Sequence, residues 1–314
     1  MLDPDIRRLL DTVFAVPPPV GEPNVAQLRA AAEAAPKLLG GAPQTVEDVR
    51  DAVVPRGADA VPVRIYRPAS AAPLPITLFA HGGGWVTGSL DSHDRLCRIL
   101  ARALASVVVA VDYRLAPEHA YPAALDDVEA AWHWVRSEAR ALGADGKRFI
   151  VAGDSSGGNL AAALSLRLAR SRLAQPDLQL LFYPALDANC SHPSYREFTT
   201  GYNLTAGQMR WYWEAYRAGA DARDPDLCPL CATELADLPP AVIAVATADV
   251  LRDDGIAYAR RLEAAGVPVR VVQCQGMIHG FLRWTGEVRA AQGWIDLVAA
   301  SARDLALGSA AVSP

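Results

Sequence analysis

The chain has 314 residues, and 51% of them are hydrophobic, which is enough to build a large buried core. Its net charge is −5, and the acidic and basic residues are interspersed, so the composition argues against nucleic-acid binding and membrane-surface binding. The first residues lack the basic start and apolar run of a signal peptide, and no stretch is apolar enough to span a membrane. Five scattered cysteines do not suggest a disulfide framework. We therefore expect a cytoplasmic protein that acts on small molecules.

The order of apolar patterns along the chain predicts an α/β fold. After helical fragments that are broken by proline and glycine, short β-branched runs alternate with helical patterns. This alternation predicts a mostly parallel sheet with helices on both faces. The predicted strands begin at Val61, Pro75, Ser106, Arg148, Leu178, Ala241 and Val269. The predicted helices begin at Ser92, Pro122, Gly157, Asp253 and Ala290.

Two segments depart from the alternation of strands and helices. Residues 188–222 are rich in aromatic side chains and contain no convincing strand, and insertions of this length are usually functional or flexible. We interpret residues 1–45 and 188–222 as a helical cap over the carboxyl edge of the sheet. Residues 46–187 and 223–308 then form the two parts of the core, followed by a tail at 309–314.

The segment Gly153-Asp154-Ser155-Ser156-Gly157 matches the G-x-S-x-G pattern and lies between a predicted strand and a predicted helix. In that setting the central serine occupies a strained turn that projects its hydroxyl above the sheet, and the two glycines avoid collisions. The helix that follows directs backbone N–H groups toward developing negative charge. The alternative is a glycine-rich turn that only packs a helix on a sheet. Because motif and setting agree, we favour Ser155 as a nucleophile.

A serine nucleophile needs a general base and a group that orients the base. In sheets of this kind such groups gather on loops at the carboxyl ends of strands. Asp249 follows one predicted strand, and His279 follows the next, which gives the order Ser, Asp, His along the chain. Asp253 is a rival for the acid, but we expect it to cap the helix that begins there. Asp249 and His279 are therefore the predicted partners of Ser155.

The segment His81-Gly82-Gly83-Gly84-Trp85 follows the strand predicted at Pro75. Consecutive glycines leave backbone amides open to a cavity, as in the oxyanion holes of lipases and esterases, and the amide after the nucleophile completes such a hole. The alternative is a flexible glycine loop. Two motifs that agree on one reaction favour the oxyanion hole.

Together, residues 81–85 and 153–159 resemble the bacterial hormone-sensitive-lipase-like (family IV) esterases of the α/β-hydrolase fold. The blocks that begin at Asp112, Asp249 and His279 are similar to other signatures of that family. The resemblance implies a carboxylic-ester hydrolase that prefers short- to medium-chain acyl esters and uses no cofactor and no metal.

The resemblance also implies roles for individual residues. Gly83, Gly84 and Ser156 would donate their amides to the oxyanion, while His81 and Gly82 would shape the loop. We further expect Trp85, Leu204 and Ile278 to line the substrate pocket.

The predicted reaction is acyl transfer through an acyl-enzyme, with Ser155 attacking, His279 moving the proton and Asp249 orienting the imidazole. An amidase or a lactonase would share the first half of this reaction. A ligand-binding receptor built on an inactive hydrolase is a further alternative, which the presence of His279 disfavours. The expected partner is a small ester, with no nucleic acid and no membrane insertion. The strand that begins at Val269 is also a candidate for pairing with a second copy in a homodimer.

Overall fold

The structure is a computed structural model and describes residues 1–15, 23–57 and 59–308. Within these residues, eight strands form one sheet in the order β1-β2-β4-β3-β5-β6-β7-β8. The β1–β2 and β2–β4 pairs are antiparallel, and all other neighbours are parallel. The strand bounds are β1 Asp48–Val54, β2 Val61–Arg67, β3 Leu74–Ala80, β4 Val107–Val111, β5 Ala144–Asp154, β6 Leu178–Phe182, β7 Ala241–Ala248 and β8 Val269–Ile278. The predicted α/β fold with a mostly parallel sheet is therefore confirmed.

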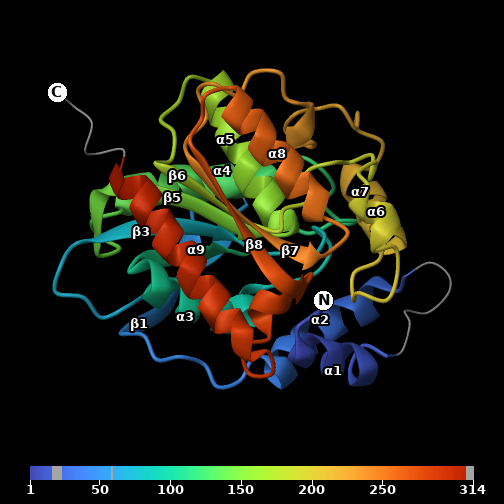
Figure 1. Ribbon diagram of the computed structural model, residues 1–314. Coiled ribbons are helices and arrows are strands. Elements are labelled where there is room, and N and C mark those ends of the chain that lie inside the picture. Colours follow the sequence, from blue (N-terminus) through green and yellow to red (C-terminus); the bar gives the residue numbers. More distant parts are fainter. Residues whose placement is uncertain (16–22, 58, 309–314) are drawn as a thin grey trace.

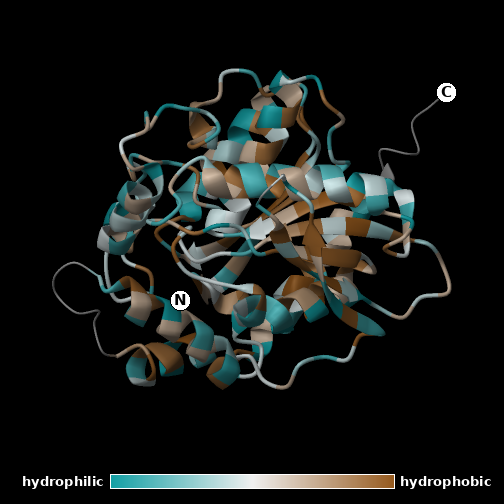
Figure 2. Ribbon diagram, turned by 180° about the vertical axis from the view of Figure 1, so that it is seen from behind, coloured by the Kyte–Doolittle hydropathy of each residue, from teal (hydrophilic) through white to brown (hydrophobic). Residues whose placement is uncertain are grey.

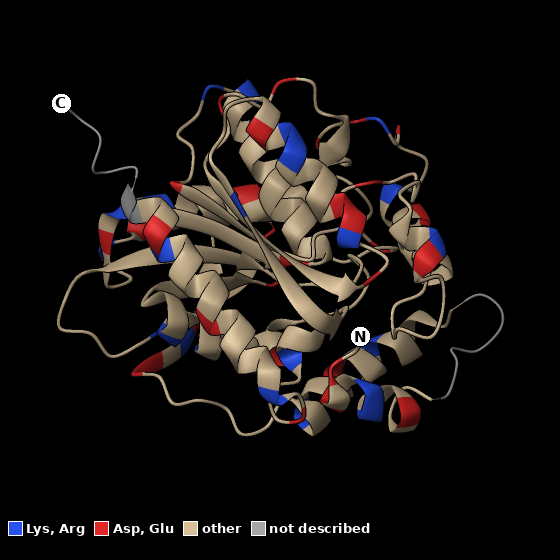
Figure 3. Ribbon diagram, in the orientation of Figure 1, with Lys and Arg blue, Asp and Glu red and all other residues tan. Residues whose placement is uncertain are grey.

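Helices cover both faces of the sheet: α3 and α9 pack on one face, and α4, α5 and α8 on the other (Figure 1). Because both faces are covered, the inner strands are apolar, and every residue of β4 and β6 is buried. Hydrophobic residues concentrate in the sheet (Figure 2), and charged residues lie mainly on the helices and loops around it (Figure 3). The helix bounds are α1 Pro4–Thr12, α2 Val25–Leu39, α3 Leu90–Leu104, α4 Ala123–Glu138, α5 Ser156–Arg170, α6 Ser194–Glu197, α7 Ala206–Arg217, α8 Arg252–Ala264 and α9 Arg289–Gly308.

The seven predicted strands correspond to β2 through β8, but β1 was not predicted. It lies at the edge of the sheet, pairs with β2 alone, and has only one buried residue, Val54. Its sequence places Asp48, Arg50 and Asp51 among the apolar residues, because an edge strand has one side in contact with water. The apolar run that predicts an inner strand is therefore missing.

The prediction that Asp253 caps a helix is wrong. Helix α8 begins one residue earlier, at Arg252, so Asp253 lies in its first turn. Its Oδ2 accepts a hydrogen bond from the backbone N–H of Ser194 at 2.9 Å, and its side chain pairs with Arg252. Asp253 therefore connects the start of α6 to the core.

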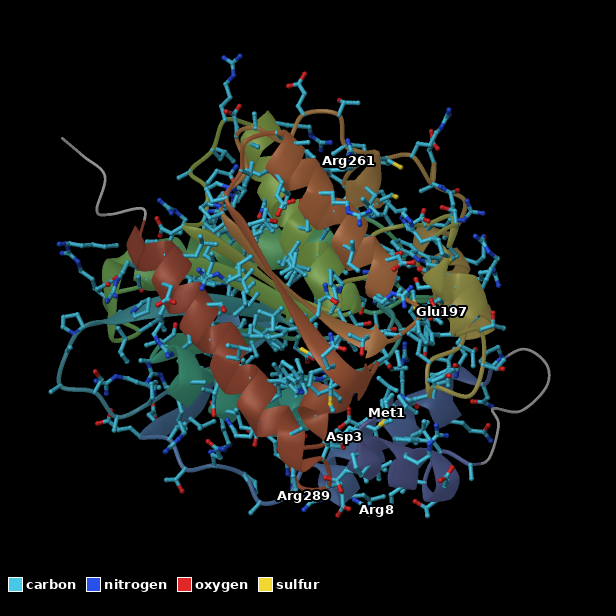
Figure 4. The ribbon with its side chains drawn as sticks, in the orientation of Figure 1. Met1, Asp3, Arg8, Glu197, Arg261 and Arg289 are labelled. Carbon is cyan, nitrogen blue, oxygen red and sulfur yellow. The ribbon has the colours of Figure 1, made fainter. Side chains whose placement is uncertain are left out.

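The helices α1, α2, α6 and α7 lie on one side of the molecule, near the carboxyl ends of the parallel strands (Figure 1). The first helix is attached near the start of α9, where Figure 4 labels Asp3, Arg8 and Arg289. The N–H of Asp3 donates to the carbonyl of Gly276 at the end of β8, and Arg289 pairs with Asp5. On the other cap segment, Glu197 of α6 pairs with Arg252, a residue of α8.

These contacts support our interpretation of residues 1–45 and 188–222 as cap segments, which we retain as a proposal. The predicted tail, residues 309–314, lies outside the described residues. Among the helices of the described residues, none has both the length and the apolar character needed to cross a bilayer.

Candidate active site

The turn between β5 and α5 holds Ser155 in a strained conformation. Its φ is 56° and its ψ is −118°, a left-handed backbone region that residues with a side chain rarely adopt. Its N–H donates to the carbonyl of Phe182 on the neighbouring strand β6 at 2.9 Å, which helps to hold the turn in place. Helix α5 begins at the next residue, so the serine lies directly at the helix N-terminus.

The glycines on either side of Ser155 are required by space. A Cβ atom added to Gly153 would lie 2.2 Å from the carbonyl oxygen of Gly157. A Cβ atom added to Gly157 would lie 1.9 Å from the carbonyl oxygen of Ala80, at the end of β3. Both distances are far inside van der Waals contact, so strand, turn and helix can pack this closely only with glycine at these positions.

The structure brings the three predicted catalytic residues together from three separate loops. The Nε2 atom of His279 lies 2.9 Å from the hydroxyl of Ser155, and its Nδ1 atom lies 2.7 Å from Oδ2 of Asp249. Asp249 is 1% exposed, and its other oxygen accepts a hydrogen bond from the N–H of Leu251. The ring of Tyr183 packs against the imidazole at 4.7 Å between centroids. This arrangement has the geometry of a nucleophile, a base and an orienting acid.

The glycine loop after β3 lies beside the nucleophile turn. Gly83 and Gly84 have φ values of 129° and 62°, which glycine adopts without steric cost. Within the described parts of the chain, the N–H groups of Gly83, Gly84 and Ser156 donate to no acceptor. The N–H of Gly82 donates to Oδ1 of Asp154 at 2.7 Å, which ties the loop to the turn. Three backbone N–H groups without an acceptor among the described residues therefore lie on the two segments that meet at Ser155.

Asp154 belongs to the G-x-S-x-G segment, but the sequence interpretation gave it no part in the candidate site. It is 2% exposed, and its Oδ1 also lies 3.3 Å from Nε2 of His93 on α3. Burial alone raises the pKa of Asp154, but His93, Arg283 and the N–H of Gly82 outweigh it and hold the pKa at about 2. Burial, with a smaller contribution from His93, lowers the pKa of His81 to about 3. A charged carboxylate and a neutral imidazole therefore lie beneath the glycine loop.

A cavity of about 320 Å³ opens above Ser155 and His279. Both cap segments contribute to it, and α7 closes on the glycine loop: a Cβ atom added to Gly84 would lie 2.3 Å from the ring of Tyr212. Its walls are largely apolar, and the sequence did not indicate that the N-terminal segment takes part. The lining residues from the cap segments are Phe14, Leu28, Ala31, Ala32, Ala35, Asn203, Leu204, Gln208, Met209 and Tyr212, and those from the core are Gly83, Gly84, Thr87, Asp154, Ser155, His279, Arg283 and Trp284.

Of the three residues expected to line the substrate pocket, the structure places only Leu204 there. Trp85 is fully buried, and its ring stacks on that of Tyr216 at 4.4 Å and meets Trp213 at 4.3 Å. Its position next to the glycine loop suggested contact with substrate, but its ring packs against Trp213 and Tyr216 of α7 instead. Ile278 is fully buried at the end of β8.

Among the described residues, one group offers three potential metal-ligand atoms within 4.8 Å of one another: Asp187, His192 and Asp254. The carboxylate of Asp254 accepts hydrogen bonds from two backbone N–H groups, one of them that of Asp187. The carboxylate of Asp187 accepts from the N–H and the hydroxyl of Ser191. We assign the group to the shape of the loop after β6, because both oxygens of Asp187 and Oδ2 of Asp254 already accept hydrogen bonds. The remaining oxygen, Oδ1 of Asp254, makes no hydrogen bond among the described residues, and burial raises the pKa of this carboxyl group.

Comparison with known proteins agrees with the fold and with the motifs. A model of a family with the alpha/beta hydrolase fold matches residues 77–283. An ethyl acetate hydrolase of Pseudomonas putida is 43% identical over 246 residues, which cover 77% of each chain. Carboxylesterase NlhH of Mycobacterium tuberculosis is 38% identical and aligns over 92% of each chain.

The chain belongs to the hormone-sensitive-lipase-like esterases of the α/β-hydrolase family. A solved structure of this kind, the hyperthermophilic esterase of the archaeon Pyrobaculum calidifontis, superposes with a TM-score of 0.89 at 35% identity. The superposition covers 97% of this chain and 99% of that one. The predicted family is confirmed, and the protein is a hydrolase enzyme.

Proposed function

We propose that this hydrolase cleaves short- to medium-chain carboxylic esters, with Ser155 as nucleophile, His279 as base and Asp249 as orienting acid. The observation that carries the proposal is the continuous set of hydrogen-bond distances from Asp249 through His279 to Ser155, 2.7 Å and 2.9 Å, at the base of an apolar cavity. The named activities of the relatives are of the same type.

In the first half of the reaction, Ser155 attacks the ester carbonyl while His279 takes its proton and then passes it to the departing alcohol. This step leaves an acyl group on Ser155. In the second half, the same imidazole removes a proton from water, which attacks the acyl group and releases the acid. Asp249 accepts a hydrogen bond from Nδ1–H, so it selects the productive tautomer and stabilises the imidazolium.

The carbonyl oxygen becomes an oxyanion at each attack. The N–H groups of Gly83, Gly84 and Ser156 are free to donate to it, and the α5 N-terminus adds its partial positive charge. A single donor of this kind is typically worth about 3 kcal/mol of transition-state stabilisation. Because Gly82 is bonded to the charged Asp154, the loop is held in place before substrate binds.

The proposal is tested with p-nitrophenyl esters of increasing acyl length and with matched anilides. We expect the Ser155→Ala variant to lose turnover by about 10⁴-fold or more, because no other group replaces the nucleophile. The matched control is Ser165→Ala, because the hydroxyl of this buried serine of α5 donates to the carbonyl of Ala161 within the same helix. This variant should keep its rate. An active Ser155→Ala variant, free of wild-type enzyme, would contradict the proposal, and faster cleavage of anilides would favour an amidase.

The proposal includes a homodimer formed through β8. This strand occupies an edge of the sheet and pairs only with β7 among the described strands. The molecular mass of the protein in solution, measured by light scattering, tests the proposed dimer. The mass of a single chain at all protein concentrations would exclude the dimer.

A further inference from the structure

Arg283 is the one lysine or arginine among the residues that line the cavity. It follows His279 by four residues and lies in the short 3-10 helix Phe281–Arg283. A Cβ atom added to Gly280 would lie 3.3 Å from its Nη2 atom, so the guanidinium lies beside the residue that follows the base. A positive charge is therefore close to the reacting atoms, in surroundings that are otherwise mainly apolar.

This guanidinium has no partner in the described part of the protein. Its Nε atom is buried and makes no hydrogen bond, and the side chain forms no ion pair there. A partly buried guanidinium without a partner costs free energy, because it loses water without gaining an acceptor. Other arginines near the site are paired: Arg29 of α2 binds Glu118, and Arg252 of α8 binds Glu197.

The acidic groups around the cavity are already engaged. Asp249 is bonded to His279, and Asp154 accepts from Gly82 and faces His93. The charge of Arg283 contributes to the low pKa of Asp154, yet the two side chains are not in ion-pair contact. The guanidinium thus retains donors that a bound molecule could use.

We propose that Arg283 binds a carboxylate on the substrate, and that the preferred substrates are esters that carry a free carboxylate beside the ester group. The planar guanidinium matches a carboxylate through two parallel hydrogen bonds, which are stronger when both partners are charged. The proposal rests on the proposed ester hydrolysis and adds the substrate class. For a monoester of a dicarboxylic acid, water cleaves the ester bond and releases the free diacid and the alcohol.

The first experiment compares isosteric esters in a pH-stat. One arm pairs monomethyl succinate with methyl succinamate, which places the charge on the acyl side. The other arm pairs the acetate ester of hydroxybutyrate with that of hydroxybutyramide, which places the charge on the alcohol side of the ester. We expect kcat/KM for the anionic ester to exceed that of its neutral partner by about tenfold or more in at least one arm. The arm that shows this preference identifies the side on which the carboxylate binds.

The second experiment substitutes the arginine. Arg283→Gln should remove the preference, so that the ratio of kcat/KM for the anionic ester to that for its neutral partner falls to about one. Arg283→Lys should retain part of the preference, because the charge remains but the paired geometry does not. Arg223→Gln is the matched control, since this exposed arginine pairs with Asp221 and changes the net charge equally. It should leave the preference unchanged.

A third measurement does not depend on turnover. Calorimetry with the Ser155→Ala variant should detect monomethyl succinate binding more tightly than methyl succinamate, and the added Arg283→Gln change should abolish the difference. Equal rates and equal binding for charged and neutral esters would overturn the inference while leaving ester hydrolysis intact. Failure to hydrolyse any ester, charged or neutral, would instead overturn the proposed function.

Discussion

The base and the walls of the active-site cavity are built in different ways. We call Ser155, Asp249, His279 and the glycine loop 82–84 the floor, and the lining residues of α2, α7 and the segment before α7 the walls. The floor lies on strand ends of one sheet and is fixed by close backbone packing and short hydrogen bonds. The walls are mainly apolar side chains from two segments far apart in sequence, with Asn203 and Gln208 as polar members. Chemistry therefore depends on local backbone geometry, whereas selectivity depends on how distant helices pack.

We expect the largest loss of activity when the charge of Asp249, which orients His279, is removed from the floor. Asp249→Asn should lower kcat by about 10⁴-fold, because the amide no longer selects the tautomer of His279 that can accept the serine proton. Steady-state kinetics with a short ester measure this loss. Asp253→Asn, four residues later, should change kcat only a few-fold, since Asp253 contacts Ser194 and Arg252 instead. Comparable losses in both variants would show that Asp249 has no special role.

The packing of the floor is tested by adding one carbon atom. Gly157→Ala places a Cβ atom 1.9 Å from the carbonyl of Ala80, so strand β3 and helix α5 must separate. We expect a loss of about 3 kcal/mol in the free energy of unfolding, measured in urea, together with lower activity.

The control for this substitution is Gly293→Ala in α9, where an added Cβ atom meets nothing within 4 Å. That change should stabilise the protein by about 0.5–1 kcal/mol, because alanine favours the helix. Stability unaffected by Gly157→Ala would mean that the floor is not packed as described.

The buried imidazole beneath the glycine loop predicts a pH dependence of stability. The pKa of His81 falls from 6.5 to about 3 on folding, so between these values the unfolded chain binds a proton that the folded chain does not. Stability from this residue is therefore lost as pH falls below 6.5, by about 2 kcal/mol between pH 7 and pH 5. Urea unfolding at both pH values should show a smaller decrease for His81→Asn than for wild type. An equal decrease would indicate that His81 titrates normally in the folded protein.

Substitutions in the walls should change activity least, and they should affect some substrates more than others. Ala32→Phe fills part of the cavity from α2, so kcat/KM for medium-chain esters should fall by about tenfold while acetate esters are hardly affected. Ala34→Phe is the matched control, because Ala34 is exposed on the same helix and does not line the cavity. A parallel loss for acetate and medium-chain esters would show that α2 affects the floor as well as the walls.

The difference between floor and walls also explains what the sequence could predict. Local features specify the nucleophile turn: an apolar strand, two obligatory glycines and a helix. The loop positions of Asp249 and His279 follow from the order of the strands.

Trp85 was misassigned because its environment is formed by Trp213 and Tyr216, more than a hundred residues away in the chain. Arg283 was overlooked because its lack of a partner among the described residues is visible only in the folded structure. Strand β1 was not predicted because an edge strand, which has one side in contact with water, carries fewer apolar residues.

One consequence concerns how the enzyme is handled and engineered. Because Phe14 and the alanines of α2 line the cavity, the N-terminal segment is part of the proposed substrate site. An affinity tag fused before Met1, which Figure 4 labels, would be attached to this segment. A tag placed after α9, whose last turn points away from the cap, is the safer choice (Figure 1). Libraries that diversify only Leu28, Ala31, Ala32 and Ala35 would offer a compact route to altered selectivity.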